Sequence, residues 1–497
     1  MSKKDVIKGS WKYVLILLLI FIPIFQHLGS VSIKLYDEAR LATNAYEMYH
    51  SGLSIIPTYA GNPDMWNTKP PLMIWLQVLS MKVVGVNEVG VRLPSAIAAF
   101  FTCILLLLVA VRYAKSFWLG FICVLVLITS AGYFAPHAIR FGDYDSLLVF
   151  FLTLGSFAFF LFLETTQKKY IYFFFISMTL AVLTKSAAAL MILPGIFIYT
   201  LIKKKLLFLL KSKDFYIGIF IFLLLVGGYY GLRELYNPGY LMAVWENEFG
   251  GRFLETIEGH KHGFWYYYEN MIGDNGGRAD NRFTTWMLLI PCGIIAGILS
   301  KDPRIKNLTI FSTIMAVTYF LVISFAQTKL HWYDLPLYPF LAILVGVFLH
   351  FIFSFLKEEK RMLHYLKYNI TPYIFVFLVF IMPYSDIVSK THMQKEYWWD
   401  VEEYRINYYL RDILKGKRSG DNFTIPYDGY AAHVRFYVKL LNDKGKNISV
   451  KKRENVVVGE TVLFSQREVR EFLEENFEYN ILEEFYNVRI YEIIAEK

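Results

Sequence analysis

The chain has 497 residues, of which 56% are hydrophobic, 18% aromatic and 19% charged, with a formal net charge of +9. This composition excludes an ordinary soluble globular protein and predicts an α-helical protein that crosses a membrane many times. The cysteines lie in or beside apolar runs, at Cys103, Cys123 and Cys292. The sequence therefore offers neither a disulfide framework nor a CxxC metal site.

Long apolar runs define the predicted membrane spans, since a helix needs about 17 to 25 apolar residues to cross a bilayer. About eleven candidate spans follow: 11–29, 91–111, 117–135, 146–163, 170–184, 187–202, 214–232, 284–300, 306–326, 334–356 and 368–386. The two spans that flank Lys185 are short. The first run lacks a small-residue cleavage site, so we expect it to remain as a helix.

Basic residues gather in alternate connections, such as "RYAKS" (112–116), "KKKLLFLLKSK" (203–213) and "KDPRIK" (301–306). The positive-inside rule places these connections and the N-terminus in the cytoplasm, and the long loops 30–90 and 233–283 outside. The tail mixes strand-like and helix-like runs. We therefore expect a membrane domain over 1–386 and a small external α/β domain over 387–497.

The first external loop begins with "KLYDEARLATNAYEMYHSG" (34–52). Its polar residues Asp37, Arg40, Asn44 and Glu47 share one face of a predicted helix, which favours an amphipathic helix at the membrane surface. Two interpretations of Asp37 and Glu38, the adjacent acids at the start of this helix, stay open. They cap its first turn, where carboxylates are favoured, or they take part in chemistry.

A second interfacial helix is predicted after Pro70 and Pro71, because the apolar run that follows is too short to span, at about fourteen residues. Lys69 stands just before this helix. Its ammonium and the free backbone N–H groups of a helix N-terminus suit a phosphate. A lysine that simply extends to the membrane surface is the alternative.

Further charged and polar residues fall on the same predicted side of the membrane. They are His137, Arg140, Asp143 and Asp145; Lys185; Arg252, His260 and His262; and Lys329, His331, Tyr333 and Asp334. Charges at membrane depth are costly and tend to line substrate paths, so several on one side suggest a shared site. The chain has no GxGxxG or Walker loop, so we expect no nucleotide cofactor and no nucleic-acid partner.

The order of five stretches resembles one known family: "DEARLATNAYEMYHSG", "TKPPLMIWLQVLSMKVVGVNEVGVRLPSA", "RFGDYDSLLVFF", "LTKSAAALMILPG" and "TKLHWYDLPLYPFLAIL". They look like bacterial polyprenyl-phosphate-dependent glycosyltransferases of the GT-C superfamily. That group includes the 4-amino-4-deoxy-L-arabinose lipid A transferases and is related to protein O-mannosyltransferases. The resemblance covers roughly residues 10 to 360, and the external tail matches only loosely.

The resemblance implies roles for individual residues. The implied catalytic residues are Asp37, Glu38 and Asp145. The implied ligands of the donor phosphate are Lys69, Lys185, Arg252, His262 and Lys329. Further candidates for the site are Arg40, Arg140, Asp143, His260 and Tyr333. A divalent metal ion is implied as a cofactor, with Asp37 and His262 as its candidate ligands. The family carries an acid just before the KPP lysine, whereas this chain has Thr68 there.

The expected function is transfer of a sugar, with inversion, from a polyprenyl-phosphate donor to an acceptor. The family implies that transfer occurs at the outer face of the bacterial inner membrane, in contact with membrane lipids, onto lipid A or another cell-envelope glycolipid. One alternative is transfer to a Ser or Thr hydroxyl of a protein, as protein O-mannosyltransferases do. A different class of function, a transporter or flippase of lipid-linked sugars, would use the charged groups as a path without forming a glycosidic bond.

Overall fold

The computed structural model describes residues 3–254, 260–273, 282–358, 369–392, 394, 396 and 401–497. The chain forms two compact units. The first comprises Met1–His27, Pro63–Met73 and Leu93–His392, and the second comprises Leu28–Asn62, Ile74–Arg92 and Met393–Lys497. Helices α3 (Leu72–Val84) and α4 (Glu88–Arg112) contribute residues to both units.

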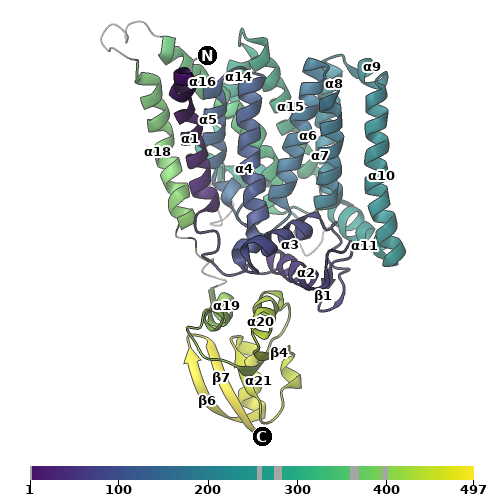
Figure 1. Ribbon diagram of the computed structural model, residues 1–497, viewed down its shortest axis with the longest axis vertical. Helices are drawn as coiled ribbons and strands as arrows, with labels where there is room; N and C mark the ends of the chain where they lie inside the picture. The colour runs from purple at the N-terminus through teal and green to yellow at the C-terminus, as the bar shows by residue number, and fades with distance from the viewer. Residues whose placement is uncertain are drawn as a thin grey trace. The chain divides into compact units, whose positions relative to one another are not determined.

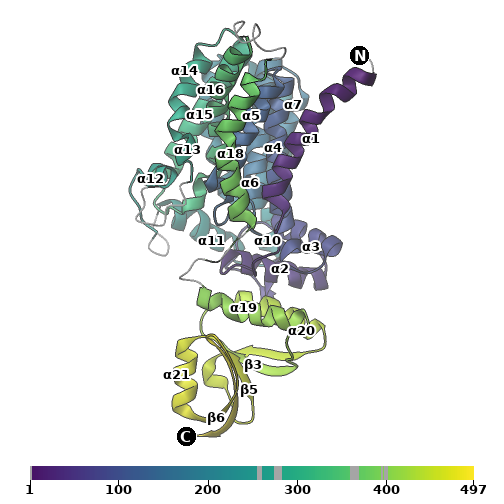
Figure 2. The same cartoon turned by 90° about the vertical axis from the view of Figure 1, so that its left-hand side faces the viewer.

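The first unit is built from long helices that lie side by side in both views (Figure 1, Figure 2). Beside most of α4, they are α1 (Lys3–Phe25), α5 (Phe117–Ile128), α6 (Asp145–Thr165), α7 (Lys169–Lys185), α8 (Leu193–Ile202), α10 (Lys213–Tyr236), α14 (Leu289–Ile298), α15 (Pro303–Phe325), α16 (Tyr338–Glu358) and α18 (Thr371–His392). Short helical segments connect them: η1 (Ala131–Phe134), η2 (Ser186–Ile192), α9 (Leu206–Leu210), α11 (Tyr240–Val244), the π-helix η3 (Trp245–Leu254), α12 (Tyr266–Ile272), α13 (Thr284–Met287) and η4 (His331–Leu337).

Seven helices in the described part of the chain are long and apolar enough to cross a membrane. Four shorter apolar helices accompany them: Ser10–Phe25, Leu72–Val84, Phe117–Ile128 and Thr284–Ile298. The predicted class, a polytopic helical membrane protein, is therefore confirmed. The number of eleven crossings stays a prediction, because length and composition alone do not fix which of the shorter helices span.

Helices α6, α7 and α8 illustrate how the chain reverses direction. Lys185 at the end of α7 pairs with Asp145 at the start of α6, whereas Lys203, just after α8, pairs with Glu164 near the end of α6. The chain therefore runs back along α6 through α7 and returns through η2 and α8. The helical stretch Lys169–Ile202 is therefore interrupted at Ser186, whose φ is 46°, and this path supports the two separate spans predicted on either side of Lys185.

The second unit is a small α/β structure, as predicted for the tail. Its five-stranded sheet has the order β4-β3-β5-β7-β6, with β3 parallel to β4 and β5, and β7 antiparallel to β5 and β6. The strands are β3 (Asn422–Pro426), β4 (Asn447–Lys451), β5 (Thr461–Phe464), β6 (Phe477–Phe485) and β7 (Val488–Glu496). The helical elements are α2 (Asp37–Ser51), part of α3, α19 (Val401–Leu414), α20 (Ala432–Asp443), η5 (Arg453–Asn455) and α21 (Arg467–Asn476). A two-stranded sheet joins β1 (Thr58–Tyr59) and β2 (Asn62–Pro63).

The loop that follows α1 folds together with the tail inside this second unit. The backbone N–H of Ile33 donates to the Tyr437 hydroxyl at 2.9 Å, and that of Leu35 donates to the Tyr404 hydroxyl at 3.1 Å. The Arg411 guanidinium donates to the carbonyls of Gly29 and Ser30. These bonds satisfy backbone groups of the loop, which would otherwise need water. The boundary at residue 387 remains a proposal for where the tail begins along the chain.

Acid should destabilise the second unit through His433, which is 1% exposed and whose pKa is lowered by burial to about 3. In the unfolded chain the ordinary pKa is 6.5, so between these values only the unfolded state takes up the proton. The contribution of His433 to the free energy of unfolding is therefore fully present above pH 6.5. It falls as the pH decreases toward 3, by about 1.4 kcal/mol per pH unit. Thermal unfolding followed by circular dichroism between pH 7.5 and 4.5 measures this slope.

His433→Gln is the control for this experiment, since glutamine can keep a hydrogen bond but does not titrate. We expect the variant to be less stable at pH 7.5 and to have a flatter dependence on pH. Parallel pH dependences of the two proteins would show that another group causes the acid sensitivity.

Candidate active site

A buried ion pair lies at the start of α6. Asp145 is the first residue of this helix, where free backbone N–H groups favour a carboxylate, and Lys185 is the last residue of α7. The Lys185 Nζ atom lies 2.6 Å from both carboxylate oxygens, and the two side chains are 7% and 3% exposed. Because desolvation offsets the attraction within such a pair, stability alone is a weak reason for placing it among apolar helices. The pair is therefore a candidate for function.

A second pair adjoins the first along the chain. The His137 Nδ1 atom lies 2.6 Å from an oxygen of Asp143, and the other Asp143 oxygen accepts from the Tyr144 backbone N–H. Burial raises the pKa of Asp143, but the hydrogen bond with His137 and the positive charges of His137 and Lys185 outweigh it and lower the pKa to about 2. Asp143 thus stays ionised at neutral pH. The Trp332 ring stacks on His137 with centroids 3.6 Å apart.

Lys69 contacts a residue that the sequence did not single out. Its Nζ atom lies 3.6 Å from Oε1 of Glu248 and 5.5 Å from the centroid of the Tyr144 ring. The Thr68 hydroxyl donates to the same Glu248 oxygen at 3.4 Å. A carboxylate from η3 therefore lies beside Thr68 and Lys69. The acids in "WENEFGG" were the available signal, but nothing in the sequence pairs that segment with Lys69.

Two loops of the first unit meet at Lys329. Its ammonium donates to the carbonyls of Ala326 at 2.6 Å and His262 at 3.1 Å, and its backbone N–H donates to the carbonyl of His260. Burial lowers the pKa of Lys329. The His262 ring is exposed and stacks on Tyr266, with centroids 4.0 Å apart. The two loops are therefore joined mainly through backbone carbonyls.

Three further predicted residues of the first unit fall in different surroundings. The Tyr333 ring centroid lies 5.2 Å from the Lys185 Nζ atom, which places this tyrosine at the first ion pair. Arg140 is buried and donates to the carbonyls of Pro23 and Ile24 near the end of α1, so its visible role is to connect helices. The side chain of Arg252 lies outside the described residues.

In the second unit, Asp37 and Glu38 begin α2 but have different surroundings. Asp37 is half-buried. Glu38 is 1% exposed, and its oxygens accept from Arg92 at 2.7 and 2.9 Å and from the Lys34 backbone N–H. Arg92 also donates to loop carbonyls, among them that of Ser32. Glu38 therefore organises the loop, and we propose that Asp37 alone of the two acids takes part in chemistry.

Arg40, one turn further along α2, lies with its guanidinium carbon 3.6 Å from the centroid of the Tyr59 ring. This cation–π contact is its clearest interaction.

The predicted site residues are divided between the two units. Lys69, Asp143, Asp145, Lys185 and Tyr333 lie within the first unit, while Asp37, Glu38 and Arg40 belong to the second. The predicted metal ligands Asp37 and His262 lie in different units, and their role stays a prediction.

Comparison with known proteins places these residues in a family context. A family model described as dolichyl-phosphate-mannose-protein mannosyltransferase matches residues 68–229. An uncharacterised protein of Aquifex aeolicus is 26% identical over 340 residues, which cover 68% of this chain and 64% of that protein. The undecaprenyl phosphate-alpha-4-amino-4-deoxy-L-arabinose arabinosyl transferase of Aeromonas salmonicida is 26% identical over 340 residues, or 65% of this chain and 57% of that enzyme. The chain thus matches less than two thirds of the length of these relatives.

A solved structure covers nearly the whole chain. The crystal structure of ArnT from Cupriavidus metallidurans bound to undecaprenyl phosphate aligns with a TM-score of 0.72 and 14% identity, over 97% of this chain and 98% of that one. At this identity the likeness shows the fold. The family match covers only part of the chain, so these comparisons show a likeness to such transferases and an ArnT-like fold.

Proposed function

We propose that the protein transfers a sugar from a polyprenyl-phosphate donor to an acceptor at the outer face of the bacterial inner membrane, with its N-terminus in the cytoplasm. The observation that carries this proposal is the buried Asp145–Lys185 pair, with His137–Asp143 directly before it in the chain. A departing phosphate develops negative charge, which preorganised cations stabilise. Lys185 is such a cation, held among apolar helices where its charge acts strongly.

The proposed reaction is a single displacement. The bond between the anomeric carbon and the phosphate oxygen breaks, and its electron pair stays on the phosphate. The acceptor hydroxyl forms the new bond from the opposite face, which inverts the anomeric centre, and Asp37 takes the hydroxyl proton. Lys69 and Lys185 neutralise the phosphate, with Lys329, His262 and Arg252 as further proposed ligands. Asp145 holds the Lys185 ammonium in place until the donor phosphate binds that ammonium in its stead.

A divalent ion is part of the proposal. Imidazole and carboxylate groups both bind divalent metals, and His137 and Asp143 offer one ligand atom each. The donor chemistry of these residues therefore fits such an ion. A bound ion would add positive charge near the leaving phosphate. Sensitivity of transfer to a chelator is the readout for this part of the proposal.

We propose lipid A or another cell-envelope glycolipid as the acceptor, because one curated relative is an arabinosyl transferase of the ArnT type. A second candidate acceptor is a protein hydroxyl. The match of residues 68–229 to the protein mannosyltransferase model favours this alternative, because that range contains Lys69, Asp143, Asp145 and Lys185.

Transfer can be tested with the purified protein in lipid vesicles, a radiolabelled undecaprenyl-phosphate sugar and a membrane extract, with and without chelator. We expect the label to move to a glycolipid. Label on protein would favour the second candidate. If the label crossed the bilayer and stayed on its donor, the enzyme proposal would fail and a transporter would have to be considered.

Replacing Lys69 by methionine should raise the KM for the polyprenyl-phosphate donor about tenfold, because a charge-assisted contact to phosphate is lost. Initial rates at varied donor concentration measure this effect. Lys82→Met is the matched control, since Lys82 is an exposed lysine near the end of α3. An unchanged donor KM in Lys69→Met would exclude Lys69 from the phosphate site.

A further inference from the structure

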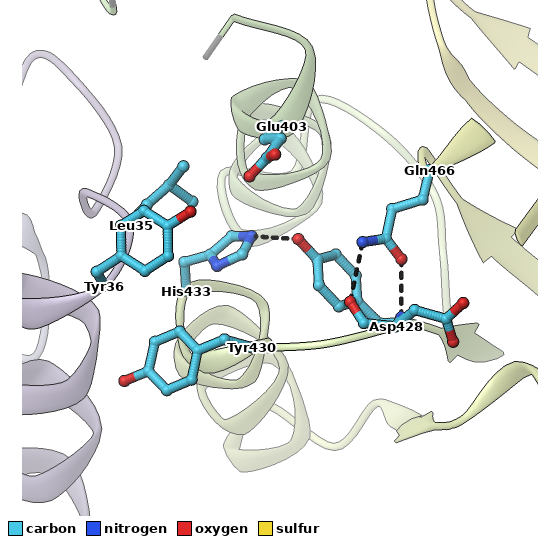
Figure 3. A pocket seen from close by; sticks show the side chains of 8 residues that line it. Leu35, Tyr36, Glu403, Asp428, Tyr430, His433 and Gln466 are labelled. Carbon is cyan, nitrogen blue, oxygen red and sulfur yellow. Dashed lines mark hydrogen bonds between the residues drawn. The ribbon is translucent and has the colours of Figure 1, made fainter. Parts of the chain in front are cut away.

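A pocket with a volume of about 150 Å³ lies within the second unit, at the first turn of α20 (Figure 3). It is lined by Leu35, Tyr36, Glu403, Tyr427, Asp428, Tyr430, His433 and Gln466. None of these residues has a role in the transfer mechanism above. The pocket combines side chains from the first external loop with side chains from the tail, so it exists only because those two segments fold together.

His433 supplies a buried imidazole to this pocket. Its Nε2 atom lies 3.2 Å from the Tyr427 hydroxyl, and the imidazole is 1% exposed. The other nitrogen, Nδ1, has no hydrogen-bond partner among the described residues. Buried polar atoms are nearly always paired, and a ligand in the pocket is one source of the missing partner. A neutral imidazole offers one donor and one acceptor, and a hydroxyl group can match either.

The charged side chains of the lining are carboxylates, those of Glu403 and Asp428. The Asp428 carboxylate pairs with Arg453 at 3.2 Å, and the Arg40 guanidinium lies 5.8 Å from the Tyr430 ring. Gln466 is held by two bonds to the backbone of Asp428, at 2.8 and 3.0 Å, which fixes its amide in the wall. A phosphate or sulfate would meet repulsion from the Glu403 carboxylate, whereas an uncharged or amine-bearing ligand would not.

Aromatic rings supply a flat wall. The Tyr36 and Tyr430 rings are parallel to within 12°, with centroids 6.2 Å apart, and Tyr59 continues the row at 6.3 Å from Tyr430. Tyr36 is 63% exposed, yet its backbone is held at a φ of 63°, a conformation that non-glycine residues rarely adopt. Such an outlier on a ligand-facing residue is typical of a constrained functional position. Flat faces beside hydroxyl and carboxylate groups suit a sugar ring, which has apolar C–H faces and polar edges.

We propose that this pocket binds a sugar ring of the acceptor through its hydroxyl groups and its apolar faces. The inference rests on the proposed function, because Tyr36 directly precedes Asp37, the proposed acceptor base. A sugar held against Tyr36 would place a neighbouring acceptor hydroxyl near that carboxylate. The pocket would thus select acceptors by their saccharide part, independently of the donor phosphate.

Binding can be measured without turnover, by saturation-transfer difference NMR on the full-length protein in lipid nanodiscs, with methyl β-D-glucopyranoside and glucosamine as probes. We expect both probes to bind. Tyr36→Ala should raise the apparent Kd about fivefold or more, through loss of the ring contact. Tyr486→Ala is the matched control, because Tyr486 is also an exposed tyrosine with positive φ, at 71% and 56°, but lies in the β6–β7 turn. It should bind as the unchanged protein does.

Two additions separate the possible ligands. Glu403→Gln should weaken glucosamine binding more than glucoside binding, since only glucosamine is cationic. Inorganic phosphate at the same concentration should not displace either probe. The inference would be overturned if the unchanged protein bound neither probe, if Tyr36→Ala bound them equally well, or if phosphate displaced them.

The outcome is distinguishable from a failure of the proposed function. Suppose that no labelled sugar left the donor in the transfer assay but the probes still bound in a Tyr36-dependent way. The proposed sugar pocket would then be kept, and the proposed transfer reaction would be rejected. If transfer occurred while Tyr36→Ala kept the same acceptor KM and the same probe affinity, only the pocket inference would fail.

Discussion

Replacing Asp145 by asparagine is expected to lower kcat about 10²–10³-fold, the range seen when one preorganised electrostatic group is lost from an active site. Asparagine cannot neutralise Lys185, so the buried ammonium would lose its partner and its fixed position. The measurement is single-turnover transfer from a saturating polyprenyl-phosphate donor, with the melting temperature recorded in parallel. Lys185→Met should reduce kcat to a similar extent.

Glu164→Gln is the matched control, because Glu164 is an acid at the opposite end of the same helix. Its carboxylate accepts from Tyr113, Tyr199 and Asn307 and pairs with Lys203 at 2.8 Å, so it is as strongly involved in structure as Asp145. We expect both variants to lose stability, but only Asp145→Asn to lose transfer. Equal losses of kcat would mean that the Asp145–Lys185 pair supports the helices and not the reaction.

The sequence predicted a charged cluster on one side of the helices but did not pair its members. Asp143 and Asp145 are two residues apart, and pattern alone cannot say which acid meets which base. The structure separates them because Asp145 is the first residue of α6 and receives Lys185 from the end of α7, while Asp143 lies in the preceding turn and meets His137. The end of a helix decides the partner, and helix ends are where sequence patterns are least precise.

Contacts between residues far apart in the chain could not be predicted from the sequence for a different reason. Glu248 reaches Thr68 and Lys69 from a position 180 residues further along the chain, and no local periodicity records such a contact. The sequence also does not predict that the loop after α1 folds with the tail. That association depends on hydroxyls such as that of Tyr437, which is 404 residues beyond its partner Ile33. Composition and hydropathy identify elements, whereas these contacts depend on tertiary packing.

The adjacent acids of the first loop show how structure can divide one motif between two tasks. An acid at a helix N-terminus is favoured whatever its purpose, so both interpretations of Asp37 and Glu38 fitted the sequence. Arg92, in the "RLPSA" stretch, resolves the ambiguity for Glu38 by occupying both of its oxygens. Asp37 is half-buried at the first position of α2, and we propose it as the base for the acceptor hydroxyl.

Asp37→Asn is therefore expected to lower kcat about 10³-fold, the scale of a lost general base, with little change in stability. The loss of one charge at the start of α2 should cost less than about 1 kcal/mol. Glu38→Gln should behave in the opposite way. It leaves the Arg92 guanidinium, 1% exposed, without its carboxylate, which should destabilise the second unit by about 3–5 kcal/mol.

Thermal unfolding and single-turnover transfer, measured on both variants at a temperature where each is folded, separate the two roles. The double variant Glu38→Met with Arg92→Met removes both buried charges, so it should recover much of the stability that Glu38→Gln loses. It should also recover transfer if Glu38 acts only by positioning the loop. A double variant that is stable but inactive would show that Glu38 takes part in the transfer reaction itself. Near-normal transfer by Asp37→Asn would show that Asp37 is not the base.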